Sequence, residues 1–133
     1  MVLSGSSETH NAGRGAFQEV DAISLLSPHA KLAVRPPSPD LIPKFIRDAY
    51  RTAVFGRPGP TFVDLPANLI LGTHDIPSRR LPAISEIPRS IAPANKIQDV
   101  VDALRSAKAP LVVIGKGAAY ARAEHPIREL IDR

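Results

Sequence analysis

The first 72 residues carry the hydrophobic pattern of short strands separated by helices. Strands are predicted at Met1–Gly5, Lys31–Val34 and Thr61–Leu65, where apolar residues run together and are closed by Gly, Pro or Ser. Between them, apolar residues recur at helical spacing over Ala16–Leu26 and again from residue 39 to 54. The order strand, helix, strand predicts an α/β fold with a parallel sheet.

A second block, residues 95–133, shows the same alternation of helical and strand patterns. Apolar positions predict an amphipathic helix from Ile97 to about Lys108, and Leu111–Ile114 is an apolar run suited to a central parallel strand. A helical segment then begins at Ala118 and continues past Pro126. Because a sheet of one strand cannot stand alone, we expect parts of two parallel-sheet domains, truncated at both ends.

The fourteen prolines divide these blocks. Four of them fall in the stretch from Gly72 to Ala94, which shows no sustained periodicity and is typical of an extended linker. The sequence therefore predicts a first domain over 1–72, a linker over 73–94 and the start of a second domain over 95–133.

Charge and composition narrow the range of partners. The formal net charge is +4 and the aromatic content 5%, and the basic residues are dispersed along the chain. Nucleic-acid binding is not expected, because it needs basic residues clustered with aromatics. A solvated surface explains this charge, and the same field also favours an anionic small ligand. No apolar run reaches the length of a membrane span.

Two glycine-containing turns are candidate anion sites. Gly115-Lys116-Gly117 follows an apolar run and opens a helix, where backbone amides suit a phosphate group. It matches neither the Walker pattern nor the dinucleotide pattern, so a plain structural turn is an equal alternative. Arg57, between Gly56 and Pro58, is either a solvated turn residue or a guanidinium held rigidly for an anion.

Gln18 and Glu19 place an amide and a carboxylate at the start of the predicted helix over Ala16–Leu26. The structural alternative is a surface Gln18 and a Glu19 that favours the positive end of the helix dipole. The four histidines share no metal-ligand spacing, and with no cysteine in the chain no thiolate zinc site is possible. No metal-binding residue is predicted.

Together these segments resemble the thiamine-diphosphate-dependent family of 2-hydroxyacyl-CoA lyases and oxalyl-CoA decarboxylases. The similar stretches are SGSSE, GAFQEVDA, GRPGPTFVDLPANL and PLVVIGKGAAYARAE. The resemblance implies that residues 1–72 are the latter half of a pyrimidine-binding domain and 95–133 the start of a central domain. It also implies a homodimer or homotetramer for the complete enzyme.

The same resemblance implies roles for individual residues. Gln18 matches a position beside cofactor and substrate, where an amide bonds the acyl carbonyl or hydroxyl without adding charge. Arg57 and Lys116, with the turn glycines Gly115 and Gly117, match positions that contact the diphosphate of CoA or of ADP. The resemblance further implies that the glutamate activating thiamine diphosphate and the segment holding Mg²⁺ lie outside this chain, so we expect no turnover by the chain alone.

The activity implied for the parent enzyme is cleavage of a 2-hydroxyacyl-CoA to formyl-CoA and a shortened aldehyde, as in fatty acid α-oxidation. Phe17-Gln18 departs from the Tyr-Glu of the decarboxylase branch, which favours the lyase. The alternatives are oxalyl-CoA decarboxylase, another thiamine-diphosphate enzyme such as acetolactate synthase, or a non-catalytic module that binds CoA or a nucleotide. The resemblance implies a peroxisomal or cytoplasmic location.

Overall fold

The computed structural model describes residues 1–75, 83 and 91–132. The chain divides into two compact units, Met1–Ile87 and Pro88–Arg133. Most of the linker predicted over 73–94 falls outside the described residues, so its extended character stays a prediction. No helix in the described part of the chain combines the length and the apolar character that crossing a bilayer requires.

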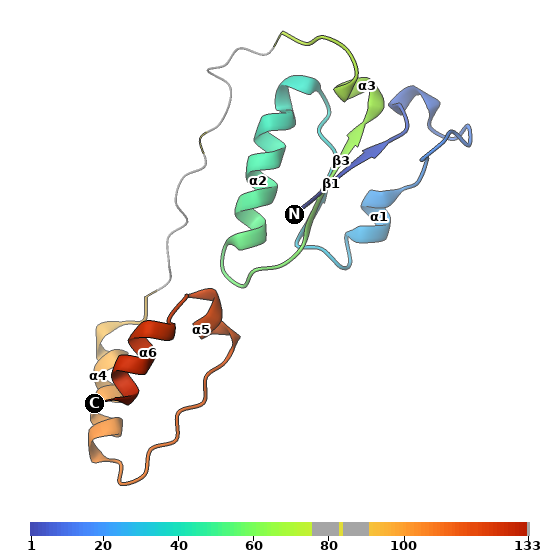
Figure 1. The fold of residues 1–133 in the computed structure, drawn as a ribbon. Helices are drawn as coiled ribbons and strands as arrows, with labels where there is room; N and C mark the ends of the chain where they lie inside the picture. Colours follow the sequence, from blue (N-terminus) through green and yellow to red (C-terminus); the bar gives the residue numbers. More distant parts are fainter. Residues whose placement is uncertain (76–82, 84–90, 133) are drawn as a thin grey trace. The chain divides into compact units, whose positions relative to one another are not determined.

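A three-stranded parallel sheet forms the centre of the first unit (Figure 1). Its strands are β1 (Val2–Ser6), β2 (Leu32–Val34) and β3 (Thr61–Pro66), in the order β1-β3-β2. Ser4 of β1 lies opposite Asp64 of β3, and Val34 of β2 lies opposite Val63. All three predicted strands are confirmed within a residue or so of their bounds, and this unit is a small α/β domain.

Helices lie on both sides of this sheet (Figure 1). The short helix η2 (Pro39–Leu41) leads into α2 (Ile42–Val54), the 13-residue helix that packs on β3. On the other side, α1 (Ala22–Leu26) contacts β3 and β2, while η1 (Thr9–Asn11) and α3 (Ala67–Ile70) follow the ends of β1 and β3. The buried apolar residues come from α2, β3 and α3: Ala49, Ala53, Phe62, Val63 and Leu69.

The helix predicted over Ala16–Leu26 is wrong in its first half. Helix α1 begins at Ala22, where the side chain of Asp21 accepts a hydrogen bond from the backbone amide of Ser24 at 3.1 Å. Gln18 has a φ of 62°, which no α-helical residue adopts. Asp21 is thus a helix N-cap, and the segment before it is a loop.

The second unit contains three helices in its described part: α4 (Ala94–Ser106), α5 (Lys116–Tyr120) and α6 (Glu124–Ile131). Helix α4 confirms the amphipathic helix predicted there. The single helical segment predicted from Ala118 past Pro126 is instead two helices, because the chain turns between them and Arg122 has a φ of 52°.

The strand predicted at Leu111–Ile114 is not present. These residues carry no regular secondary structure, and their four apolar side chains are exposed. No strand occurs elsewhere in residues 91–132, so their backbone has no partner for a ladder of hydrogen bonds within the described part of this unit. The parallel sheet predicted for the second domain is therefore not formed among the described residues.

Candidate functional site

Polar side chains gather where β1 and β2 end in the first unit. An open hollow of about 160 Å³ lies there, lined mainly by Ser6, Ser7, Glu8, Glu19, Asp21 and Arg35. Ser6 is the last residue of β1, and Arg35 directly follows β2. The carboxyl ends of parallel strands are where α/β folds place their ligands. This hollow is therefore a candidate binding site of the unit.

Arg35, which lines the hollow, forms an ion pair with the buried Asp64. Asp64 of β3 is 1% exposed, and its Oδ2 accepts from Nε of Arg35 at 2.6 Å and pairs with Nη2 at 2.5 Å. The other oxygen, Oδ1, and the buried hydroxyl of Ser6 have no hydrogen-bond partner among the described residues. A buried polar atom without a partner is costly, so these two groups have capacity left for a ligand or a water.

Glu19 closes the loop that borders the hollow. Its carboxylate accepts hydrogen bonds from the backbone amides of Gly13 and, at 3.0 Å, of Ala16. The bond from Gly13 and then the bond from Ala16 lower the pKa of Glu19 below its ordinary value of 4.5, because hydrogen bonds to the charged form favour that form. The interpretation of Glu19 as a helix-dipole residue is wrong, since the helix starts three residues later.

Gln18, the predicted active-site amide, is exposed on this loop and is not among the residues that line the hollow. Its neighbour Phe17 is also exposed, to 88%. The two side chains are presented to the outside of the first unit. That placement leaves the amide of Gln18 accessible to a ligand or to another part of an enzyme, and its predicted role stays a prediction.

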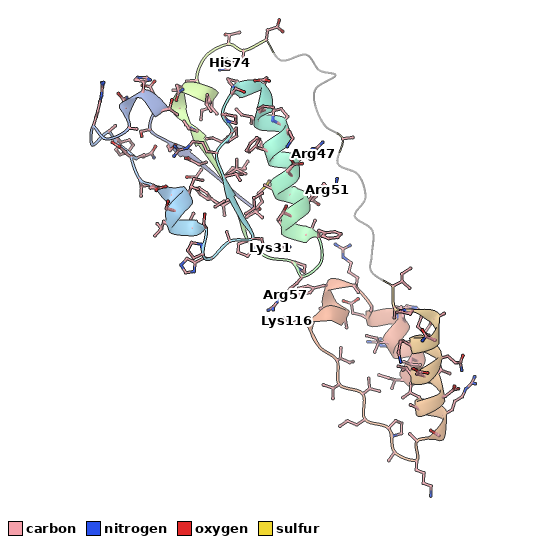
Figure 2. The ribbon with its side chains drawn as sticks, turned by 180° about the vertical axis from the view of Figure 1, so that it is seen from behind. Lys31, Arg47, Arg51, Arg57, His74 and Lys116 are labelled. Atoms are coloured by element: carbon pink, nitrogen blue, oxygen red, sulfur yellow. The ribbon has the colours of Figure 1, made fainter. Side chains whose placement is uncertain are left out.

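Arg57 lies in a turn that Lys31 holds in place (Figure 2). The ammonium of Lys31 donates to the backbone carbonyls of Phe55 at 2.8 Å and of Arg57 at 3.0 Å. A Cβ added at Gly59 would come within 2.8 Å of Cδ of Lys31, so a larger residue there would have to displace the Lys31 side chain. The backbone on both sides of Arg57 is therefore fixed, while its side chain is exposed.

Lys116 belongs to the second unit, as do Gly115 and Gly117. Gly115 precedes the five-residue helix α5, which begins at Lys116, and the side chain of Lys116 is exposed. A Cβ added at either glycine would meet no atom within 4 Å, so space beside both is open. The predicted meeting of Arg57 and Lys116 on one diphosphate joins residues of two units and stays a prediction.

No metal site occurs in the described ranges 1–75, 83 and 91–132. They contain no group of three or more His, Asp or Glu side chains that could hold a metal ion.

Comparison with known proteins decides the relationship. Over 136 residues, covering all of this chain, the sequence is 37% identical to human 2-hydroxyacyl-CoA lyase 1, and it is 36% identical to the mouse protein over 134 residues. It is 32% identical over 143 residues to the oxalyl-CoA decarboxylase of Escherichia coli K12, covering 99% of this chain. The chain is homologous to 2-hydroxyacyl-CoA lyases and oxalyl-CoA decarboxylases. The resemblance stated from the sequence is confirmed.

These homologues are enzymes that use thiamine diphosphate. The chain spans 23–24% of the length of the lyases and the decarboxylase named above. No protein-family model matches the chain.

The sequence prediction missed the hollow at the strand ends, with Ser6, Arg35 and Asp64. One signal was available: Asp64 interrupts an otherwise apolar strand, and a charge in such a place needs a partner. The identity of that partner could not be read from the sequence, because it depends on the register between β2 and β3.

Proposed function

We propose that this chain is the part of a 2-hydroxyacyl-CoA lyase that contributes Gln18 to the surroundings of the acyl group and Arg57 and Lys116 to the binding of CoA. The parent reaction is cleavage of the bond between C1 and C2 of a 2-hydroxyacyl-CoA. It yields formyl-CoA and an aldehyde one carbon shorter. The observation that carries the proposal is the 36–37% identity to two such lyases over the whole chain.

Oxalyl-CoA decarboxylase is the alternative within the same homologous group. Its identity to this chain is lower, at 32%, and the Phe17-Gln18 pair departs from the Tyr-Glu expected in that branch. A neutral amide suits an acyl group with a hydroxyl, because it both donates and accepts hydrogen bonds. The sequence of this loop therefore favours the lyase.

Two observations support a role for Arg57 in CoA binding. Its backbone is held by Lys31, so the guanidinium loses less freedom when it binds. Its side chain is exposed and planar, and it can form two parallel hydrogen bonds to a phosphate. In the other unit, Lys116 adds a second exposed cation beside two glycines with open space.

Within the parent enzyme, thiamine diphosphate supplies the carbanion stabilisation. The described residues of this chain contain no group of three or more His, Asp or Glu side chains that could hold a metal ion, and no step through the cofactor is assigned to them. Their proposed contribution is to bind and orient the substrate. By itself, this chain is expected to bind CoA or ADP but not thiamine diphosphate.

The first prediction concerns CoA affinity. We expect calorimetry on the full chain to detect CoA and ADP binding, weakened about tenfold by Arg57→Ala or by Lys116→Ala, because each removes a charge-assisted hydrogen bond. Higher salt should weaken binding further. Arg51→Ala and Lys108→Ala are matched controls, since each removes an exposed cation from the same unit, and both should leave affinity unchanged.

Equal losses in the control variants would mean that affinity follows net charge and not the two named cations. Absence of any CoA or ADP binding by the folded wild-type chain would end the CoA assignment. Tight binding of thiamine diphosphate with lyase turnover would contradict the proposed division of roles within the enzyme.

A further inference from the structure

The loop before α1 has an unusual backbone. Gly13 and Gly15 have φ angles of 80° and 68°, and Gln18 has 62°. Glycine adopts such angles readily, but a residue with a Cβ seldom does. Some interaction must therefore hold Gln18 in this conformation.

Packing of the loop's aromatic residue does not supply that interaction. Phe17 is 88% exposed and Gln18 is exposed as well. What ties the loop together is Glu19: its carboxylate accepts from the amides of Gly13 and Ala16, and its own amide donates to the carbonyl of Ala16 at 3.0 Å. The part of the loop before Gln18 is thus hydrogen-bonded, at Gly13 and Ala16, to the residue that directly follows Gln18.

We propose that Glu19 is the positioning residue of this loop: its carboxylate fixes the Gly13–Glu19 segment so that Gln18 keeps its left-handed backbone and presents its amide in one orientation. A role of the Gln18 side-chain amide in substrate binding rests on the proposed function. The ordering of the loop by Glu19 does not. Glu19 acts through Gln18 and need not touch substrate.

Protonation of Glu19 releases the loop. Its pKa is lowered by the bonds from Gly13 and Ala16, so the contribution to loop order is fully present above the ordinary value of 4.5. It is lost as pH falls through the lowered pKa of the folded protein.

The charged groups that share the hollow with Glu19 are engaged elsewhere. Glu8 pairs with His10 at 3.0 Å, and Arg35 with Asp64 at 2.5 Å. Asp21 is bonded to Ser24, whose hydroxyl and amide lower the pKa of that aspartate, with a smaller contribution from the charge of Arg35. The loop amides of Gly13 and Ala16 are bonded to the carboxylate of Glu19 itself. The acid transition of these amides therefore reports mainly on Glu19.

The test is NMR of the full chain, with the backbone amides of Gly13 and Ala16 as probes. Glu19→Ala should speed hydrogen exchange at both amides about tenfold or more, and Glu19→Gln, which keeps one acceptor oxygen, should give an intermediate effect. In the wild type, the Gly13 amide shift should titrate below pH 4.5, and this titration should vanish in Glu19→Gln. Asp21→Ala is the matched control, since it removes another carboxylate bonded to a backbone amide.

Protected β3 amides in every variant establish that the domain is folded. Unchanged exchange at Gly13 and Ala16 in Glu19→Ala would overturn the proposal, as would a Gly13 titration that persists in Glu19→Gln. Either result would leave the CoA measurement untouched. Conversely, a loop that depends on Glu19 in a chain that binds no CoA would support the positioning role and contradict the proposed function.

Discussion

At the scale of single residues, the most consequential contact is the ion pair between Arg35, which lines the hollow, and Asp64. Asp64 is 1% exposed, while the side chain of its partner Arg35 is 41% exposed. A buried carboxylate that loses its partner is strongly destabilising, since its charge remains without compensation. The contact therefore links the carboxyl edge of the sheet to the stability of the whole unit.

The prediction that follows is for Arg35→Met. We expect it to lower the free energy of unfolding by about 2–3 kcal/mol, less than for a fully buried pair because Arg35 is partly solvated. Urea unfolding followed by the β3 amide signals measures this. Adding Asp64→Leu should recover much of the loss, because the double variant leaves no unpaired buried charge. A double variant no more stable than Arg35→Met would contradict this account.

Residue-scale prediction from sequence succeeded where the chemistry was local. The turn at Arg57 was expected, and the glycines and prolines around it indicate it directly. The role of Lys31 in holding that turn was not expected, because it joins residues 24 and 26 positions apart. The same holds for Glu19: the hydrogen bonds that its carboxylate accepts from backbone amides depend on loop dihedral angles, which hydrophobic periodicity does not encode.

At the scale of elements, two segments that the sequence predicts to be strands differ in the structure. Thr61–Pro66 is the central strand, paired on both sides, whereas Leu111–Ile114 is exposed and unpaired among the described residues. Hydrophobic pattern measures suitability for a strand, but strand formation needs a neighbour that supplies hydrogen bonds. Sequence therefore predicted all three strands of the first unit and wrongly added one in the second.

This contrast is testable with one substitution at two places. Val63→Ala should cost about 2 kcal/mol of unfolding free energy, because Val63 is 0% exposed and its methyl groups leave a cavity. Val113→Ala should change it by less than about 0.5 kcal/mol, since Val113 is 84% exposed. The measurement is chemical denaturation of the full chain. Similar losses at the two sites would mean that the Leu111–Ile114 segment is buried in solution.

The misassigned helix over Ala16–Leu26 has a local cause. Apolar residues at Phe17 and Val20 fit a helical period by chance, and both side chains are exposed. Asp21 supplies a stronger signal, since it can cap a helix that begins after it. Capping chemistry outweighed periodicity here.

At the scale of the whole molecule, the two units differ in what holds them together. The first has a parallel sheet and buried side chains from α2, β3 and α3. The described part of the second contains no buried residue, and its helices are 13, 5 and 8 residues long. Helices shorter than about 12–15 residues are marginal in water without packing. Stability should therefore be concentrated in the first unit.

Amide hydrogen exchange tests this distribution. The amides of β3 exchange only when the central sheet opens, so they should be the most protected in the chain. Those of α6 open locally and should exchange roughly 100-fold faster or more. Val63→Ala serves as the internal control. It should speed amide exchange in β3 and leave exchange in α6 unchanged, because α6 belongs to the other unit. Equal protection of β3 and α6, falling together in Val63→Ala, would show instead that the two units unfold as one cooperative body.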